Sequence, residues 1–509
     1  MKAFIYRFSP GFLCLLYERV EASPLGYRLA KGAFWSLAGS LISRGLGLLS
    51  AILVGRMLGK HGFGELGMIQ NTVGLFGTVA GFGMGMTATK HVAEFRISDP
   101  ERAGRIIAMA SATTWATSVV MGLALVVFAP WLAERTLAAP QLADLLRVGA
   151  LLLILGGVNG AQTGALAGFE AFKTISRINL ISGLLSFPMM VIGAWYWGVT
   201  GATWGLVGSN GINCALNNIA LREEISRAKI TLNFSHCFRE TGVLWNFNLP
   251  TVADGLLNGL VTWGCSAILA HQLSGYSDMG AYNAVLRVKL LPEAVFGVLV
   301  APLLPVLSDS IGRSDYKGFH QAAHYSFALG IFLLVPISLL QMTAPGLTLL
   351  PFGKAFEGSQ PIVEWMMAHS ILKALLGPVG SIVTSGGKLW FALSVNALYA
   401  VLSMLLAWWL VPLYRGAGMA AAQTVAFAAA NSLLICFLFR TYPSLMASLR
   451  WWSLFVGIMV LAVLAVWSAA HMSFLLSILA GFLITLVFVL WQAWLQGRSI
   501  ILGLEVVKH

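Results

Sequence analysis

The chain has 509 residues, of which 58% are hydrophobic and 10% are charged, and its mean hydropathy is +0.80. Soluble proteins are about 25% charged, so a water-soluble chain of this size would need far more charged side chains to cover its surface. The formal net charge is +12. A basic excess can indicate nucleic-acid binding, but this chain is too apolar to present a soluble basic face. The composition excludes a soluble multidomain protein with a nucleic-acid partner and indicates an integral membrane protein.

Apolar segments long enough to cross a membrane, which takes about 20 residues, follow one another along the whole chain. Charges, Pro or Gly bound each segment, and the gaps leave no room for a sizeable water-soluble domain. The sequence predicts an all-α integral membrane protein with about 14 transmembrane helices. The expected spans are 33–54, 67–89, 105–129, 145–167, 176–196, 200–221, 242–269, 280–306, 321–343, 362–384, 389–411, 416–438, 452–470 and 474–494.

The distribution of Lys and Arg predicts the orientation, because cytoplasmic loops of membrane proteins are enriched in these residues. When charges at the edge of a span are counted with the adjoining loop, the side that holds both termini has 22 Lys and Arg and the opposite side has six. Both termini are therefore expected in the cytoplasm. Most of the net charge of +12 is a signal of topology, and only the net +2 inside the spans concerns the ligand.

The two halves of the chain resemble each other when the sequence is shifted by about 216 residues. Each half holds an even number of helices, so the repeats are expected to be parallel, related by an axis along the membrane normal, around a central cavity. Such lobes usually serve alternating access, although a duplicated scaffold without transport remains an alternative. The predicted organisation is a cytoplasmic or interfacial lead over 1–30, six-helix lobes over 31–225 and 240–440, and two extra helices over 450–495. The matching pairs are Ser98-Asp99 with Ser314-Asp315, Gly168 with Gly386, Asn179 with Asn396, and Gly201-Ala202 with Gly416-Ala417.

Six charged residues remain inside the predicted spans, namely the cations Arg44, Arg287, Lys289 and Lys373 and the acids Asp254 and Glu293. A charge at a helix centre costs about 2.5–3.5 kcal/mol, so most of them should face water, one another or a ligand. Lys289 and Glu293 are four residues apart and could form an ion pair within one helix. The other three cations have no acid one turn away, and all four cations, Lys289 included, are candidates for substrate binding. The net +2 favours an anionic ligand, and phosphate or diphosphate fits clustered Arg and Lys.

Polar residues at helical spacing form two stripes inside the spans. Asp254 and Asn258 follow Pro250, which removes a backbone hydrogen bond and predicts a hinge. The second stripe is Asn210, Asn213 and Asn217. Asparagine can link neighbouring helices, or these side chains can form a hydrogen-bonding wall for a sugar-like ligand. Asp254 and Glu293 are also the candidates for coupling transport to a proton or another cation.

The sequence contains no phosphate-binding GxxxxGK[ST] motif and no His, Cys or Asp cluster with metal-ligand spacing. No ATPase, cofactor or metal site is therefore expected. The predicted outer loops are short, which makes a membrane enzyme of glycan assembly a poor fit. A transporter is the favoured class.

Three glycine-rich stretches at the start of the chain resemble a known family. Ser43-Arg44-Gly45-Leu46-Gly47, Gly55-Arg56-Met57-Leu58-Gly59 and Gly62-Phe63-Gly64 are similar to the opening of the polysaccharide-transporter branch of the MOP superfamily. This branch holds the O-antigen flippases and related flippases of lipid-linked oligosaccharides. The resemblance extends over the whole chain through the helix count, the repeat and the polar turn at Gly168-Phe169-Glu170.

The resemblance implies a flippase that moves an oligosaccharide on a polyprenyl diphosphate of the undecaprenyl type from the cytoplasmic to the outer face of the bacterial inner membrane. By similarity to the lipid II flippases, Arg44 would lie in the cavity, and the last two helices would form a groove for the isoprenoid tail. The expected partners are the lipid-linked oligosaccharide, membrane lipids and the glycan polymerase machinery. Helix two is less basic than in the lipid II flippases, which favours an O-antigen or exopolysaccharide repeat unit. A lipid II flippase and a MATE-type drug or cation antiporter remain alternatives.

Overall fold

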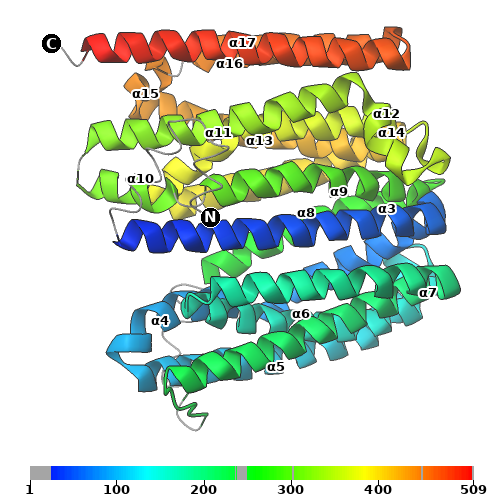
Figure 1. The fold of residues 1–509 in the computed structure, drawn as a ribbon. Helices are drawn as coiled ribbons and strands as arrows, with labels where there is room; N and C mark the ends of the chain where they lie inside the picture. The colour runs from blue at the N-terminus through cyan, green and yellow to red at the C-terminus, as the bar shows by residue number, and fades with distance from the viewer. Residues whose placement is uncertain are drawn as a thin grey trace.

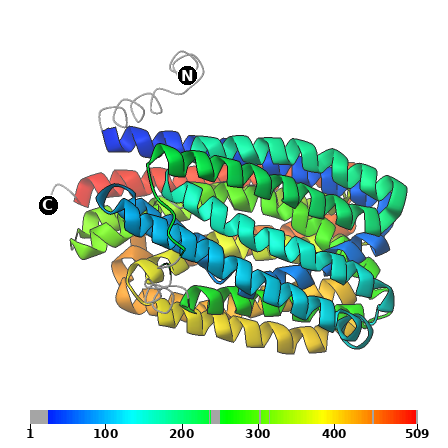
Figure 2. The same cartoon turned by 90° about the horizontal axis from the view of Figure 1, so that it is seen from below.

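The protein is a bundle of long helices that lie side by side along one common direction, and the residues described in the computed structural model contain no strands (Figures 1 and 2). This confirms the predicted all-α membrane fold. The structure describes residues 24–234, 237, 249–300, 303–313, 315–448 and 451–506. Most of the predicted lead over 1–30 therefore lies outside the described residues.

The first lobe contains five helical elements, several of which are much longer than one membrane span. They are α3 Pro24–Gly81, α4 Met84–Ser98, α5 Pro100–Trp131, α6 Ala143–Gly168 and α7 Phe172–Arg227. A short π-helical turn, Leu132–Thr136, and a 3₁₀ turn, Pro140–Leu142, connect α5 to α6.

The second lobe repeats this pattern and is followed by a pair of helices. Its elements are α8 Leu249–Ala270, α9 Gly275–Val300, α10 Leu303–Gly312, α11 Tyr316–Thr343, the short α12 Pro345–Leu349, α13 Gln360–Ser385, α14 Leu389–Thr441 and the short α15 Pro443–Ser448. The final pair is α16 Trp451–His471 and α17 Phe474–Val506, and both of these helices pack along α11 (Figure 1).

Among the described residues, 11 helices are long and apolar enough to cross a membrane, and three of these contain a bend. The bends lie at Gly59 in α3, at Trp197 and Gly198 in α7 and at Arg415 in α14. Figure 1 shows α3 reversing direction at one end of the bundle. Counting each bent helix as two passes gives 14 passes, as predicted. The backbone is non-helical at each of these bends, so α3, α7 and α14 each consist of two helices joined by a tight reversal of the chain.

Equivalent positions in the two lobes have the same local structure. Gly198 has φ 59° and ψ −137°, and Arg415, at the corresponding place in the second lobe, has φ 52° and ψ −127°. Asp99 and Asp315 each cap the N-terminus of the next helix, and each carboxylate accepts a hydrogen bond from the backbone N–H three residues on, at 3.0 Å. The repeat predicted from the Ser-Asp pairs is therefore present in the backbone.

Loss of either cap should destabilise the protein by a similar, modest amount. We expect Asp99→Ala and Asp315→Ala each to lower the free energy of unfolding by about 1 kcal/mol, because an orphan N–H at the helix start loses its acceptor. Thermal unfolding of the purified protein in detergent measures the effect. Asp99→Asn and Asp315→Asn, which keep an acceptor oxygen, are the controls and should stay near wild type.

The lobes meet where α3, after its bend, crosses α9. A Cβ atom added to Gly64 would lie 1.8 Å from the carbonyl oxygen of Tyr276, and one added to Gly280 would lie 1.8 Å from that of Lys60. A shift of 216 residues, which superimposes the two halves of the sequence, places Lys60 on Tyr276 and Gly64 on Gly280, so the two contacts are equivalent. The pseudo-twofold axis of the repeat therefore passes between α3 and α9 at this point, where only glycine permits the approach.

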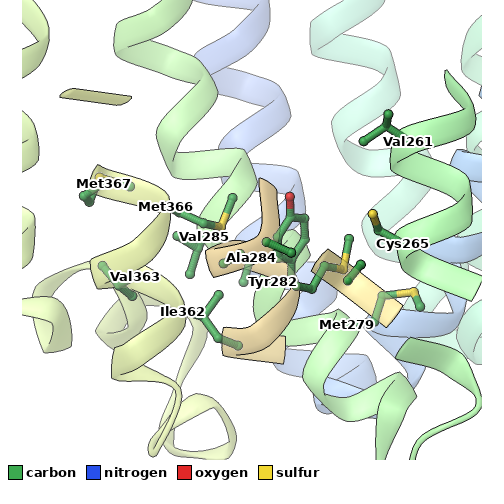
Figure 3. Packing of buried hydrophobic residues seen from close by; sticks show 14 of the residues in the cluster. Val261, Cys265, Met279, Tyr282, Ala284, Val285, Ile362, Val363, Met366 and Met367 are labelled. Atoms are coloured by element: carbon green, nitrogen blue, oxygen red, sulfur yellow. The ribbon is translucent and has the colours of Figure 1, made fainter. Parts of the chain in front are cut away.

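The apolar core of the second lobe forms around α9. Figure 3 shows Tyr282 and Met279 of α9 between Cys265 of α8 and the methionines of α13. The Tyr282 hydroxyl donates a hydrogen bond to Gln423 Oε1 of α14 at 2.6 Å, so this buried polar atom is satisfied. Packing on both sides holds α9 in place. This helix carries Arg287, Lys289 and Glu293, three of the six charged residues that the sequence places inside membrane spans.

Candidate functional site

The bend at Gly59 divides α3 into a first arm, residues 24–58, and a second arm, residues 60–81. A cavity of about 600 Å³ lies in the first lobe, between the second arm of α3, the start of α4, and α6. Its wall is unusual because it contains eight glycines and no charged side chain, with Gln70, Thr78 and Asn210 as polar members. At Gly74, Gly77, Gly81, Gly156 and Gly160 an added Cβ would meet no atom within 4 Å. Because glycine has no side chain, these positions widen the cavity and expose helical backbone at its surface.

The helix that borders this cavity is broken between α3 and α4. Phe82 and Gly83 have φ values of 43° and 65°, and the Thr117 hydroxyl donates a hydrogen bond to the carbonyl of Ala80. This bond satisfies an acceptor at the end of α3 that the broken helix leaves free. The break lets α4 turn away from the second lobe and pack against α5 and α6.

Arg287 lies near the middle of α9 and connects the second lobe to the cavity. Its guanidinium donates a hydrogen bond to Oε1 of Gln70, a residue of the cavity wall 217 residues earlier. The two residues occupy equivalent places in the repeat. Arg287 is nevertheless exposed, so a cation at mid-membrane depth remains accessible between the lobes.

Lys289, Glu293 and Lys373 form a charge cluster inside the second lobe, in which Lys289 and Glu293 are buried and Lys373 is partly exposed. Glu293 lies 3.6 Å from Lys289 on the same helix and 2.8 Å from Lys373 on α13, and the Ser370 hydroxyl donates to it at 2.9 Å. The predicted intrahelical pair is confirmed. The prediction that Lys373 is unpaired is wrong, because its acid comes from a neighbouring helix rather than from its own.

Removing the acid of this cluster should destabilise the protein strongly. We expect Glu293→Gln to lower the free energy of unfolding by about 3 kcal/mol, since Lys289 then loses the counter-charge that offsets its burial. Thermal unfolding in detergent is the measurement, and Glu224→Gln, which breaks the exposed pair with Arg227, is the control. Equal stability of the two variants would show that the cluster is not a buried ion pair.

The stripe after Pro250 is polar and joins two helices. Asn396 of α14 donates a hydrogen bond to Asp254 Oδ1 at 2.6 Å, and Asn258 donates to the Asp254 carbonyl at 2.9 Å. Asn258 is exposed and Asp254 is partly buried. Pro250 is the second described residue of α8, and 241–248 lie outside the described residues, so the hinge stays a prediction.

The asparagine stripe of α7 divides into two environments. Asn210 lines the cavity of the first lobe. Asn217 is buried, and it donates to Asn213 at 2.7 Å and to Asn159 of α6. The inner part of the stripe therefore links helices, and Asn210 alone of the three lies at the cavity surface.

Three of the predicted cations share one depth in the bundle. Arg44 precedes the bend at Gly59 by roughly four helical turns, and Arg287 and Lys373 follow the starts of α9 and α13 by roughly three to four turns. With a rise of about 1.5 Å per residue, all three are about 18–22 Å from the same end of the bundle. Arg44 is exposed on the first arm of α3, whose Ser43 and Leu46 face α7.

At the end of the bundle where α3 bends, the lobes are closed against each other. Lys60 donates a hydrogen bond to the carbonyl of Glu357 at 2.9 Å, and Arg56 donates to that of Pro351. Phe63 packs against Phe352 and Phe356, with ring centroids 6.1 and 6.3 Å apart. At the other end, α4 packs on helices of its own lobe and so does α10. Within the described part of the chain, the contacts that close the lobes against each other therefore lie at the end where α3 bends.

Comparison with known proteins shows the family to which the chain belongs. A family model described as polysaccharide biosynthesis protein matches residues 29–311, more than half of the chain. The chain belongs to this family. The lipid III flippase of Escherichia coli (strain K12) is 22% identical over 408 residues, which cover 78% of this chain and 95% of the relative. The lipopolysaccharide biosynthesis protein WzxC of the same organism is 22% identical over 369 residues, covering 72% and 71%.

Solved structures share the fold. The lipid II flippase MurJ in an inward closed conformation matches with a TM-score of 0.68 at 16% identity, over 92% of this chain and 99% of that one. An inward-facing MATE multidrug resistance transporter of the MOP superfamily matches with a TM-score of 0.65 at 13% identity, over 81% and 99%. The MOP-type fold predicted from the sequence is confirmed, and the chain is a multi-pass membrane protein of the polysaccharide biosynthesis family.

Several residues near the site were not predicted from the sequence. Gln70 and Asn396 were not proposed, although each is a polar residue in an apolar span. The repeat held the signal for Gln70, because a shift of 217 residues places it on Arg287. The cavity glycines had no comparable signal, since glycine is frequent throughout the chain.

Proposed function

We propose that the protein is a flippase for a polyprenyl-diphosphate-linked oligosaccharide, an O-antigen or exopolysaccharide repeat unit. The main support for this proposal is the position of Arg287, an exposed cation at mid-membrane depth next to a neutral, glycine-lined cavity. The cation compensates the charge of a diphosphate, which an apolar membrane interior cannot do. The neutral cavity offers Gln70, Asn210 and backbone groups to sugar hydroxyls. Arg44 is the second cation proposed for this path.

The proposed direction is from the cytoplasmic to the periplasmic face of the bacterial inner membrane by alternating access. The excess of Lys and Arg favours a cytoplasmic location for both termini. With that orientation, the sealed end that contains Lys60 and Glu357 is periplasmic and the cavity loads from the cytoplasm. The names of the curated relatives, a lipid III flippase and a lipopolysaccharide biosynthesis protein, support a lipid-linked glycan as the substrate.

Further parts of the proposal concern coupling and partners. Asp254 and Glu293 are the groups proposed to couple transport to a proton or cation. The isoprenoid tail would lie along α16 and α17, whose apolar surfaces are extensively exposed. The glycan polymerase machinery is the proposed protein partner, and the protein itself carries no catalytic role.

Reconstituted transport tests the proposal. Purified protein in proteoliposomes that hold a polyprenyl-diphosphate oligosaccharide on one leaflet should make the glycan accessible to an impermeant glycosidase on the other side. Two further arms use lipid II and a lipophilic cation under a proton gradient. Movement of the cation without movement of the lipid would contradict the flippase and favour an antiporter, and equal movement of lipid II would contradict the proposed choice of glycan.

A further inference from the structure

A second cavity, of about 320 Å³, lies on the other side of α6 from the first. Residues of α5, α6 and the last turns of α7 line it, and Leu232 and Phe234 of the segment that follows α7 complete the wall. This segment is tied to α5, because a Cβ atom on Gly104 would lie 2.1 Å from the Thr231 carbonyl oxygen. The flippase path described above does not use this cavity.

Among the residues that the structure describes, two buried polar groups in the cavity wall have no hydrogen-bond partner. They are the Thr114 hydroxyl and the Gln162 side-chain oxygen, and both residues are more than nine-tenths buried. Buried polar atoms are nearly always paired, so each calls for a partner inside the cavity. The amide oxygen of Gln162 is an acceptor only, and its partner must therefore be a donor such as a hydroxyl.

The rim of the cavity combines a free cation with a membrane-facing apolar ridge. Arg222 is exposed, and within the described part of the chain no hydrogen bond or ion pair engages it. Trp115, half exposed at the same rim, begins a ridge on α5 that continues through the exposed Val119, Leu123 and Val127 at four-residue spacing. Side chains at this spacing lie on one face of a helix, so the ridge runs from the cavity along the membrane-facing side.

We infer that this cavity is a binding site for an anionic phospholipid whose head group carries a hydroxyl, of the phosphatidylglycerol type. Arg222 pairs with the phosphate, Gln162 and Thr114 receive the head-group hydroxyls, and the acyl chains lie along the ridge that starts at Trp115. The cavity lies near the end of the bundle predicted to be cytoplasmic, which makes it a site for a lipid of the cytoplasmic leaflet.

Native mass spectrometry of the delipidated full-length protein tests the site. Phosphatidylglycerol should bind more tightly than phosphatidylcholine, and Arg222→Gln should weaken it roughly fivefold, the effect of one cation near a lipid surface. Arg227→Gln is the matched control, because this cation lies on the next turns of the same helix, is paired with Glu224 and does not line the cavity. Retention of full binding by Arg222→Gln, or an equal loss in the control, would overturn the assignment.

A second variant tests the hydroxyl contacts. Gln162→Leu removes the unpaired acceptor while keeping a side chain of similar size, so the protein should fold. It should reduce the preference for phosphatidylglycerol over phosphatidic acid, which has the phosphate without the glycerol head group, and leave the part that depends on Thr114. A preference equal to that of the wild type in Gln162→Leu would refute the contact between Gln162 and a head-group hydroxyl. Because the measurement is lipid binding rather than flipping, its outcome is independent of the proposed transport.

Discussion

Export of surface glycan should fall by roughly 10- to 100-fold when Arg287 is replaced by alanine. The side chain is a cation at mid-membrane depth and can contribute a charge-assisted hydrogen bond worth about 1.5–3 kcal/mol to a diphosphate. Its present partner, Gln70, is neutral, so the positive charge stays available to a ligand. Arg287→Lys should keep part of the activity, because it retains the charge and loses the two-pronged geometry. Arg44→Ala is expected to have a loss of the same kind.

Complementation of a flippase-deficient strain, with surface glycan and membrane protein level measured together, checks this prediction. The matched control is Arg313→Ala, which removes an exposed arginine that pairs with Asp309 at the end of α10. Normal glycan in the control together with its loss in Arg287→Ala supports the cation-lined path. Full complementation by Arg287→Ala and Arg44→Ala at normal protein levels would rule that path out.

The local and periodic features of this protein could be predicted from its sequence. Span positions follow from hydropathy alone. The described parts of the predicted spans are helical except at the break between α3 and α4, which span 67–89 crosses, and residues 242–248 and 301–302 lie outside the described residues. The repeat could be found because Asp99 and Asp315 cap helices through their own side chains. A cap is a local interaction, so a short motif is enough to reveal it.

Contacts between helices were harder to predict from the sequence. The sequence shows Lys289 and Glu293 one turn apart, but it does not show that α13 places Lys373 against the same carboxylate. That contact depends on the rotation of two packed helices about their axes, which hydropathy leaves undetermined. For the same reason the stripe of Asn210, Asn213 and Asn217 could be located on a helix but not divided into cavity and helix-linking positions.

The glycines at the axis of the repeat lead to the second large effect that we expect. Gly64→Ala should favour a state that is open at the end sealed by Lys60 and Glu357, and it should reduce glycan export. The added Cβ would lie 1.8 Å from the Tyr276 carbonyl oxygen, a backbone atom that can yield only if α3 and α9 separate. The added methyl group overpacks the sealed state by about 1–3 kcal/mol and leaves the open state unaffected. The ratio of open to sealed protein should therefore rise by roughly 5- to 150-fold.

Thiol labelling measures this shift directly. Asn283 is buried against Gly67 in the sealed interface, so a cysteine at 283, in a chain whose own cysteines are replaced by serine, reports opening to an impermeant reagent. Gly280→Ala should act like Gly64→Ala, because the pseudo-twofold axis makes their contacts equivalent. Gly297→Ala, on the same helix as Gly280 and with no atom within 4 Å of the new Cβ, should leave labelling unchanged. If Gly64→Ala labels no faster than Gly297→Ala, the close approach of α3 and α9 does not hold the lobes shut, and the seal must depend on the loop contacts of Lys60 and Phe63 instead.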